Sequence, residues 1–269
     1  MLYYLNGINI NNKYSNIIKL MNSLLIKTIY KELRYNNVKM LVFDMAGTTI
    51  NEGGIVYNTL YSTMKDFKLD VKKDDIHHWH GKNKYEVLDH FLSTKYNINN
   101  NTYKFYKLKL SENFNDNLKK NYFDSSKIKI MHPDMPDLFN KIRERNIKIA
   151  LNTGYNKEIQ KSIIDRLNME RFIDDYISSE EVHKGRPEPY MINYLKEKHN
   201  ISSRHIIKVG DTTNDMLEGI NAYCLTSIGV LTGADTKKDL SKCYNNWEMF
   251  NYPHPKICIL NNVMDINVL

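Results

Sequence analysis

Three aspartates, Asp44, Asp211 and Asp215, are the side chains of this sequence best suited to chemistry. Asp44 follows a short apolar run that begins at Val38, and Asp211 follows a second one that begins at His205. Carboxylates gathered in one place repel one another, which raises their pKa values unless a cation lies among them. All-oxygen ligands of this kind suit Mg²⁺, which is commonly bound by one or two carboxylates and a substrate phosphate. The pattern therefore predicts a divalent-cation site if the fold brings the three side chains together.

Strands must carry these carboxylates to one place, and the chain after His132-Pro133 has the required alternation. It predicts helices at 134–145, 156–167, 188–199 and 214–221, and strands at 147–152, 174–179, 205–210, 223–230 and 257–260. Strands that alternate with helices of about ten residues indicate an α/β fold with a doubly wound parallel sheet. Ligands of such sheets bind at the carboxyl ends of the strands, where Asp44, Thr153 and Asp211 are expected to converge.

The region between the first strand and this alternation is different. Residues 55–126 contain helical patterns at 55–67, 84–95 and 102–120 and no good strand, so we expect an all-helical insertion. The core would then comprise residues 38–54 and 127–269, with residues 1–37 as an N-terminal extension. An amphipathic pattern from Ile17 to Leu33 predicts a helix in that extension, which either packs on the body or belongs to a cleaved targeting peptide.

Composition excludes several classes of protein. The 269 residues are 42% hydrophobic and 26% charged, as in ordinary globular chains. No stretch approaches the roughly 18 apolar residues that a membrane-spanning helix requires. The three cysteines lie far apart without CxxC spacing, which argues against a disulfide scaffold or a zinc ribbon. Of the net charge of +7, residues 1–39 carry +5, so the body gives little reason to expect nucleic-acid binding.

Four segments resemble, in order, the motifs of the haloacid dehalogenase superfamily. They are Asp44-Met45-Ala46-Gly47-Thr48-Thr49, Asn152-Thr153-Gly154-Tyr155, Gly185-Arg186-Pro187-Glu188-Pro189-Tyr190-Met191 and Val209-Gly210-Asp211-Thr212-Thr213-Asn214-Asp215-Met216-Leu217-Glu218-Gly219. More narrowly, the chain from about residue 39 to at least 235 resembles phosphonoacetaldehyde hydrolase (phosphonatase) and its phosphonatase-like relatives. The resemblance implies a Rossmann-like core with an inserted helical cap, in agreement with the pattern of elements.

The resemblance also implies roles for the residues at the motif positions. Asp44 resembles the nucleophile that attacks phosphorus and forms an aspartyl-phosphate. The residues implied to hold Mg²⁺ are Asp44, the main-chain carbonyl of Ala46, Asp211 and Asp215, and those implied to bind the substrate are Thr48, Thr153, Gly154 and Arg186. Thr153 and Arg186 would also serve catalysis, since phosphoryl transfer depends on positioning and charge neutralisation. The guanidinium of Arg186 offers a permanently charged fork for phosphate oxygens.

Ala46 is the informative departure from the ordinary phosphatases of the superfamily. Those enzymes have an aspartate two residues after the nucleophile, and its general acid–base help is typically worth about 10²–10⁴ in rate. Phosphonatase instead uses a cap lysine that forms an imine, or Schiff base, with the substrate aldehyde, and Lys84 aligns with that lysine, three residues after Gly81. An ordinary lysine is protonated at pH 7, so this role requires a lowered pKa, to which Arg186 and Mg²⁺ could contribute.

Two interpretations of Lys84 stay open. A Gly-x-x-Lys turn also occurs in relatives that form no imine, where the cation faces the substrate or has a structural role. Phosphonatase carries a histidine three residues after its lysine, whereas this chain has Val87, and Glu86 and His90 are then the nearest proton-transfer candidates. We therefore expect a Mg²⁺-dependent hydrolase that cleaves phosphonoacetaldehyde to acetaldehyde and phosphate. The alternative is a phosphatase for a small phosphorylated metabolite.

Three further interpretations belong to other classes. The strand-end aspartates could simply cap helices, with Asp211 as the N-cap of the helix that follows it. The chain could be a catalytically idle sensor or scaffold that binds phosphate, or its basic extension could bind nucleic acid without specificity. We expect a small phosphorylated or phosphonated metabolite as partner, no nucleic acid and no membrane span, with a homodimer left open. The expected compartment is the cytoplasm, or an organelle if residues 1–37 act as a transit segment.

Overall fold

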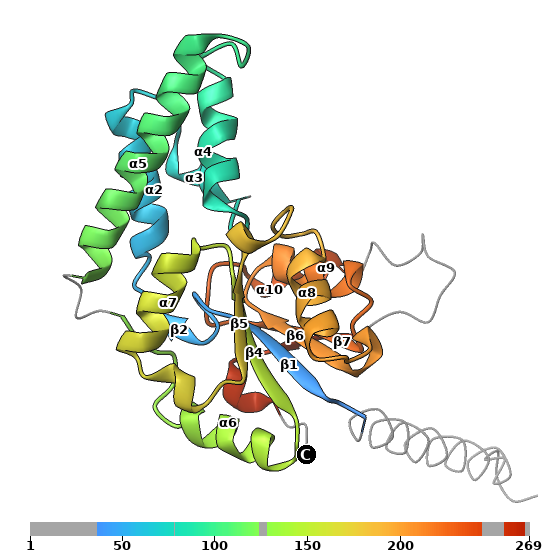
Figure 1. The fold of residues 1–269 in the computed structure, drawn as a ribbon. Helices are drawn as coiled ribbons and strands as arrows, with labels where there is room; N and C mark the ends of the chain where they lie inside the picture. The colour runs from blue at the N-terminus through green and yellow to red at the C-terminus, as the bar shows by residue number, and fades with distance from the viewer. Residues whose placement is uncertain (1–36, 78, 124–127, 244–255, 267–269) are drawn as a thin grey trace, which may run out of the picture. The chain divides into compact units, whose positions relative to one another are not determined.

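The main sheet has six parallel strands, and the strand that ends in Asp44 lies inside it (Figure 1). A computed structural model describes residues 37–77, 79–123, 128–243 and 256–266. The strands of this sheet are β1 (Met40–Asp44), β4 (Lys148–Thr153), β5 (Asp175–Ser178), β6 (Ile206–Gly210), β7 (Thr226–Val230) and β8 (Lys256–Leu260). Their order in space is β5-β4-β1-β6-β7-β8. This is the order of a doubly wound Rossmann-like sheet, in which the chain runs outward from the first strand in both directions.

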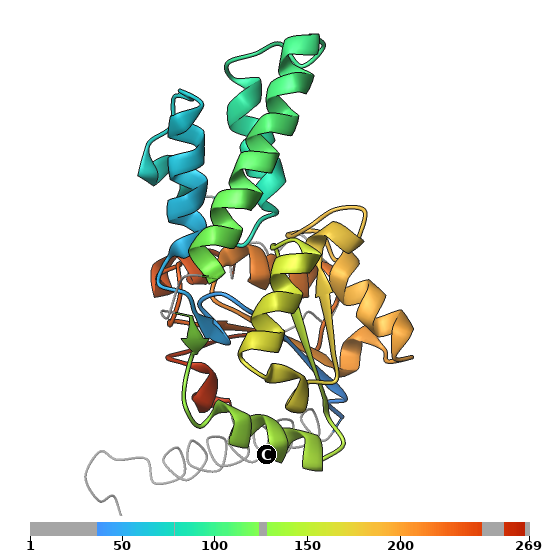
Figure 2. The same ribbon diagram turned by 60° about the vertical axis from the view of Figure 1, so that its left-hand side comes forward.

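Helices cover both faces of this sheet (Figures 1 and 2). They are α6 (Met135–Glu144), α7 (Lys157–Arg166), α8 (Tyr190–Lys198), α9 (Thr213–Asn221) and α10 (Lys237–Ser241). Val42 of β1 belongs to a buried cluster that includes Met191 of α8, whereas the ring of Phe43 lies 4.9 Å from the ring of Phe139 in α6. Because both faces are covered, all of β1 is buried, and its apolar run forms a strand without alternating polar residues.

A second group of helices is inserted between β1 and β4. They are α2 (Ile55–Asp66), α3 (Lys73–His77), α4 (Lys84–Ser93) and α5 (Asn101–Phe123). Both α2 and α4 pack against α5, as Figure 2 shows. On α5, Leu110, Phe114 and Leu118 are buried at every fourth position, which forms one apolar stripe. No strand occurs in the described part of residues 55–123, so the predicted all-helical insertion is confirmed.

Two short strands join the insertion to the sheet. They are β2 (Ile50–Asn51), on the way into the insertion, and β3 (Lys129–Ile130), on the way out. The two pair in antiparallel orientation, with Ile50 opposite Ile130 and Asn51 opposite Lys129. The Met131 amide extends the ladder by donating to the Thr49 carbonyl at 2.9 Å. The two passages of the chain between the sheet and the insertion are therefore held side by side. The sheet and the insertion belong to one compact unit, Val38–Val268.

The elements predicted after His132 are all present, with ends displaced by a few residues. The largest displacement is at β7, predicted from residue 223, because Tyr223 adopts a positive φ of 57° that a strand cannot contain. The sequence pattern missed α3, α10, β2 and β3, which are too short to show a period. The helix predicted over residues 17–33 lies outside the described residues. Among the described helices, none is both long and apolar enough to cross a membrane.

Candidate active site

The carboxyl ends of three strands bring Asp44, Thr153 and Asp211 to one edge of the sheet. Asp44 is the last residue of β1, Thr153 is the last of β4, and Asp211 directly follows β6. The chain leaves the neighbouring strands β1 and β6 in opposite directions, which opens a crevice between their ends. Carboxylate oxygens of Asp44, Asp211 and Asp215 lie within 4.8 Å of one another, and all three residues are buried. The predicted convergence of the strand ends is therefore confirmed.

Arg186 links the carboxylates below this edge, and its side chain is only 1% exposed. Its Nη1 donates to Asp44 Oδ1 at 2.6 Å and lies 3.0 Å from Asp215 Oδ1. Its Nε donates to Glu218 Oε2 at 3.0 Å, and its Nη2 donates to Asn152 Oδ1 at 2.9 Å. Burial alone would lower the pKa of Arg186, but the charges of its three acidic partners outweigh burial, so the pKa lies above its ordinary value. The guanidinium is therefore fixed and permanently charged.

Lys208, in the middle of β6, is a second fully buried cation. Its Nζ donates to Asn152 Oδ1 at 2.8 Å and lies 2.9 Å from Asp215 Oδ1 and 3.5 Å from Glu218 Oε2. A lysine inside a buried strand would be strongly destabilising without such partners. The network thus contains two cations and four carboxylates, Asp44, Asp211, Asp215 and Glu218. Its formal charge is −2 when every carboxyl is ionised, which is the charge that one divalent cation neutralises.

The three clustered aspartates differ in pKa because their charged neighbours differ. Burial raises the pKa of Asp44 to about 6, although Arg186 opposes the effect. Burial, with the neighbouring Asp44 and Asp215, raises the pKa of Asp211 well above its ordinary value. Burial also acts on Asp215, but Arg186 and Lys208 outweigh it and hold the pKa of that carboxyl low. Asp44 and Asp211 are therefore the two carboxyl groups whose negative charge the buried cations of the chain do not fully offset, and two buried carboxylates of this kind fit a divalent ion with oxygen ligands.

Asp211 is held in place by the loop that follows β1 and by the loop that follows β7. The Thr48 hydroxyl donates to Asp211 Oδ1 at 3.0 Å, and the Ala234 amide donates to Oδ2 at 2.7 Å. Gly47 has a φ of +83°, and a Cβ atom there would lie 2.5 Å from Asp211 Oδ2. Only glycine allows the chain to turn this close to the carboxylate. Thr48 thus contacts Asp211, and its expected contact with substrate stays a prediction.

The interpretation of Asp211 as a helix cap is wrong. Thr212 is the N-cap of α9, and its hydroxyl accepts a hydrogen bond from the Asp215 amide at 3.2 Å. The Asp215 carboxylate in turn accepts from the Thr212 amide at 3.2 Å, which completes a capping box. Asp215 therefore caps α9 while it binds Arg186 and Lys208. Of the three clustered aspartates, it is the one with least capacity left for a metal ion.

A cavity of about 330 Å³ lies above the strand ends. The sheet side is lined by Asp44, Ala46, Thr153, Gly154, Tyr155, Arg186, Asp211, Thr212 and Ala234, and the insertion contributes Tyr57, Gly81 and Lys84. A second cavity of about 790 Å³ shares Ala46, Tyr57, Asp211 and Ala234 with the first. The larger cavity has room for a small metabolite, and the inner one adjoins it through these four residues. The structure brings together every residue predicted for the site, although Thr48 and Asp215 lie behind the cavity wall.

Lys84 reaches this cavity from the insertion and is 4% exposed. Its Nζ donates to the Tyr57 hydroxyl at 2.9 Å and to the Lys82 carbonyl at 2.8 Å. Burial lowers the pKa of Lys84 to about 8, with Asp44 opposing the effect and Arg186 adding to it. Lys84 is also the first residue of α4, and the positive end of a helix disfavours an ammonium ion. A lysine with a lowered pKa is what the imine mechanism requires.

The turn before Lys84 docks on the sheet side through its backbone. The Asn214 side chain donates to the His80 carbonyl at 2.6 Å, and Arg186 Nη1 approaches the Gly81 carbonyl at 3.4 Å. Gly81 has a φ of +77°, and a Cβ atom there would lie 2.3 Å from the Thr212 hydroxyl oxygen. The contact is therefore too close for any other residue. It fixes the start of α4, and with it Lys84, over the strand ends.

The structure does not place the nearest proton-transfer candidates in sequence against Lys84. Val87 is fully buried, and the exposed His90 ring lies 4.6 Å from the ring of Trp79. No hydrogen bond or ion pair joins Glu86 or His90 to Lys84 in the described part of the chain. The side chain that contacts Nζ is Tyr57, and no pattern along the chain distinguishes it from the other tyrosines among the 19. Asn152, Lys208 and Glu218 were not predicted for the site either, although a cation within an apolar strand signals Lys208.

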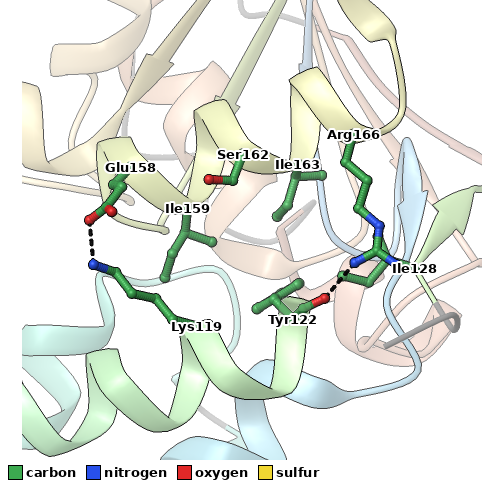
Figure 3. Close-up of a pocket in the computed structure, with 8 residues that line it drawn as sticks. All are labelled: Lys119, Tyr122, Ile128, Glu158, Ile159, Ser162, Ile163 and Arg166. Atoms are coloured by element: carbon green, nitrogen blue, oxygen red, sulfur yellow. Dashed lines mark hydrogen bonds and ion pairs between the residues drawn. The ribbon is translucent and has the colours of Figure 1, made fainter. Parts of the chain in front are cut away.

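The insertion contacts the sheet's helices at a second place, between α5 and α7 (Figure 3). Lys119 of α5 forms an ion pair with Glu158 of α7 at 2.7 Å. Arg166 Nη1, at the end of α7, donates to the Tyr122 carbonyl in the last turn of α5 at 2.6 Å. A cation at this position also interacts favourably with the negative end of α5. This junction contains no carboxylate cluster like that at the strand ends, and we assign it no chemistry.

A family model described as haloacid dehalogenase-like hydrolase matches residues 41–229 of the chain. Among known proteins, the chain is 27% identical over 218 residues to a bifunctional phosphonoacetaldehyde hydrolase/aminoethylphosphonate transaminase of Clostridioides difficile strain 630, which covers 78% of this chain and 33% of that protein. It is 20% identical over 192 residues to a phosphoglycolate phosphatase of Aliivibrio fischeri, which covers 71% of this chain and 83% of that protein. The chain thus spans about a third of the bifunctional relative.

Solved structures share this fold. A phosphonoacetaldehyde hydrolase-like protein from Oleispira antarctica superimposes with a TM-score of 0.64 at 19% identity, covering 85% of this chain and 89% of that one. At this level of identity the likeness shows that the α/β fold is shared. The residues that the family model matches, 41–229, include all four motif segments.

Proposed function

We propose that this chain, which belongs to the haloacid dehalogenase-like hydrolases, hydrolyses the carbon–phosphorus bond of phosphonoacetaldehyde to give acetaldehyde and phosphate. The observation that carries the proposal is the amine of Lys84. It is buried, its pKa is lowered to about 8, and it lines the same cavity as Asp44. An amine that forms an imine must be neutral when it attacks, so the lowered pKa supports this role of Lys84 over that of a permanent cation.

In the proposed reaction, Lys84 attacks the substrate aldehyde in its neutral form. A C–N bond forms, water leaves, and the resulting imine stands beside the C–P bond. Asp44 then attacks phosphorus, the C–P bond breaks, its electron pair moves into the imine, and the imine nitrogen takes up a proton to give an enamine. Hydrolysis releases acetaldehyde from Lys84 and phosphate from the aspartyl-phosphate. This route needs no acid at the position of Ala46, since the imine accepts the electrons of the broken bond.

The residues on the sheet side would hold the phosphonate group. Thr153, Gly154 and Arg186 line the cavity beside Asp44, and the guanidinium of Arg186 already lies against the nucleophile. With substrate bound, this cation would balance the charge that develops on the phosphoryl oxygens. We assign residues 55–126 to the cap domain and residues 38–54 and 127–269 to the core domain, so that the substrate binds between the two.

Magnesium is the proposed cofactor. Asp44, Asp211 and the carbonyl of Ala46 would hold it, with Asp215 behind them, because Asp44 and Asp211 are the buried carboxyl groups whose pKa values are raised in spite of the cations nearby. When bound, the ion would neutralise the two carboxylates and the phosphonate oxygens, so that nucleophile and substrate can approach each other. The residues of the chain itself bind the substrate, orient it and exclude water.

A phosphatase for a small phosphate ester is the second candidate. Val87 favours it, because this buried apolar side chain stands where phosphonatase has a histidine. The likeness to a phosphoglycolate phosphatase over 83% of that protein supports the same candidate. In either case, we propose a small phosphorylated or phosphonated metabolite as substrate and the cytoplasm as compartment. An idle phosphate sensor is disfavoured by the lowered pKa of Lys84, for which a sensor has no use.

Borohydride trapping tests the proposal. Incubation of the full-length protein with Mg²⁺, phosphonoacetaldehyde and borohydride should inactivate it and leave a reduced adduct on the peptide that contains Lys84, as detected by mass spectrometry. Lys82→Met provides a matched control, because Lys82 lies on the same turn with its amine over the Trp79 ring, and it should still be trapped. Lys84→Met should not. An unlabelled wild type that releases phosphate from esters would identify the phosphatase instead.

A further inference from the structure

The hydroxyl group of Tyr57 is the one side-chain group that contacts the Lys84 amine in the described residues. Tyr57 lies in the first turn of α2 and its oxygen accepts hydrogen bonds from Lys84 Nζ and from the Gly81 amide, both at 2.9 Å. The Lys84 Nζ lies 4.5 Å from the centroid of the Tyr57 ring, and the His80 ring packs against the same ring at 4.1 Å. The oxygen is therefore fixed against the amine from two directions.

A phenol oxygen accepts two hydrogen bonds and donates one. Both acceptor positions of Tyr57 are taken by the two N–H groups, and within the described ranges nothing accepts its own proton. Tyr57 also lines both cavities, the one above Asp44 and the larger one beside it. The remaining O–H is thus available to an acceptor atom in the substrate space, and the same oxygen is already bonded to the amine that would attack.

We propose that Tyr57 is a catalytic residue that relays protons between the Lys84 amine and the oxygen of a substrate carbonyl. As the C–N bond forms and the C=O π bond opens, the nitrogen gives a proton to the Tyr57 oxygen, and Tyr57 gives its own proton to the carbonyl oxygen. In a second pair of transfers, the remaining N–H proton moves to the Tyr57 oxygen, and the Tyr57 proton moves to the oxygen of the former carbonyl group, which leaves as water. Atoms and charge balance at each step, and no phenolate accumulates. The inference rests on the proposed function, since it concerns the formation of the imine.

The surroundings of Tyr57 favour a neutral relay over an ionised base. Burial, together with Asp211, Glu52 and Asp44, raises the pKa of Tyr57 well above its ordinary value. A phenol with such a pKa keeps its proton, yet it can exchange one proton for another within a chain of hydrogen bonds. The neutral form of Lys84, populated because its pKa is about 8, supplies the nucleophile.

The relay also accounts for the departure at Val87. That side chain is fully buried and carries no proton, and Tyr57 contacts the same amine from a different element, α2 instead of α4. A position on α2 keeps the oxygen on the side of the larger cavity, which shares Tyr57 with the inner one. The carbonyl end of the substrate would therefore lie at the junction of the two cavities, with the phosphonate at Asp44.

Tyr57→Phe removes the hydroxyl group and keeps the ring, and Tyr85→Phe is the matched control. Tyr85 lies next to Lys84, and its hydroxyl contacts Asn115 and Asn156 and not the amine. The measurement is the rate of borohydride trapping in a single turnover with phosphonoacetaldehyde. We expect a loss of about 10²-fold or more in Tyr57→Phe, the scale of a lost general acid–base group, and no more than a few-fold change in Tyr85→Phe.

Two additional readouts separate a relay from a purely structural role. Acetyl phosphate should phosphorylate Asp44 without help from Lys84, because acetate is a stable leaving group. The rate of this phosphorylation should change no more than a few-fold in Tyr57→Phe. Imidazole, a small acid–base that fits the 790 Å³ cavity, should restore trapping in Tyr57→Phe in proportion to its concentration and leave the wild type unchanged. A trapping rate equal to that of the wild type would overturn the relay, and so would a slow rate that imidazole does not change. Absence of trapping in the wild type itself would instead overturn the proposed function and the relay with it.

Discussion

The two sides of the cavity hold their cations in opposite ways. On the sheet side, Arg186 and Lys208 are buried among carboxylates and are bonded through every nitrogen they possess. On the side of the insertion, Lys84 is equally buried, but its two acceptors are a hydroxyl group and a carbonyl group, and both are neutral. The pKa of Arg186 is raised by its partners, while the pKa of Lys84 is lowered to about 8.

This difference separates two tasks. In the proposed reaction, the cations on the sheet side would position phosphorus and offset the charge of the nucleophile, whichever substrate is bound. A neutral amine on the other side would bond to carbon and so help to determine which leaving group can be released. Because the two sides come from separate parts of the chain, a substitution of Lys84 should affect the leaving-group chemistry without disturbing the charge network at the strand ends.

The largest effect is expected at Asp44, because both proposed tasks depend on this nucleophile. Asp44→Asn keeps the shape of the side chain and removes the nucleophile, so phosphate release should fall by about 10⁴-fold or more with every substrate.

Lys84→Met should abolish phosphate release from phosphonoacetaldehyde only, and leave phosphorylation by acetyl phosphate intact. Parallel assays of phosphate release from the two compounds check both expectations. Equal losses in Lys84→Met with both compounds would show that the two sides are not separate.

Arg186→Met is expected to have the next largest effect, on stability. The substitution leaves Asp44, Asp215 and Glu218 without their shared cation in a buried site, and such a loss typically costs about 3–5 kcal/mol. Urea denaturation of the metal-free protein measures it. Arg143→Met is the control, because this half-exposed arginine pairs with Asp174 at the surface, and it should change the free energy of unfolding by less than about 1 kcal/mol.

Lys84→Met should change stability in the opposite direction. The folded protein releases the Lys84 proton near pH 8, and the unfolded chain releases it near pH 10.5, so the ammonium ion destabilises the fold below pH 8. That penalty, roughly 3 kcal/mol from the difference in pKa, fades as the pH rises from 8 to 10.5. Wild type should therefore gain stability over this range relative to Lys84→Met, which should be the more stable of the two at pH 7. Urea denaturation at several pH values measures the difference, and parallel curves would contradict the lowered pKa.

The smallest effect is expected at the junction between α5 and α7 (Figure 3). The Lys119–Glu158 ion pair is exposed, so water and salt screen it. Lys119→Ala should leave the melting temperature and phosphate release within the error of the wild type. A clear loss of activity would mean that this junction, and not only the turn at Gly81, holds the insertion over the strand ends.

The sequence predicted the sheet side of the site well and the other side only in part. Asp44, Thr153 and Asp211 could be placed because each follows a strand, and parallel strands end at one edge of the sheet. Lys84 could be named only by resemblance, and its lowered pKa depends on burial that no local pattern reveals. Tyr57 was missed because its role depends on where α2 lies relative to α4. Lys208 was overlooked although a cation within the apolar strand Ile206–Gly210 requires buried anions nearby.

The function of Asp215 shows a related limit. From the sequence it is one of three equivalent aspartates, but in the structure it closes a capping box with Thr212 and binds Lys208. Which carboxylate faces the cavity and which lies behind it depends on the direction of α9 after β6. That direction follows from the packing of the helix on the sheet, which spacing along the chain does not encode.

The ladder between β2 and β3 joins the two passages of the chain that lead into and out of the insertion. Lys84, Tyr57 and Gly81 all lie between these two strands in the sequence. Because the Tyr57 oxygen accepts hydrogen bonds from both the Lys84 amine and the Gly81 amide, the three residues form one preassembled unit, and a substitution that displaces the insertion at the ladder should displace all three together.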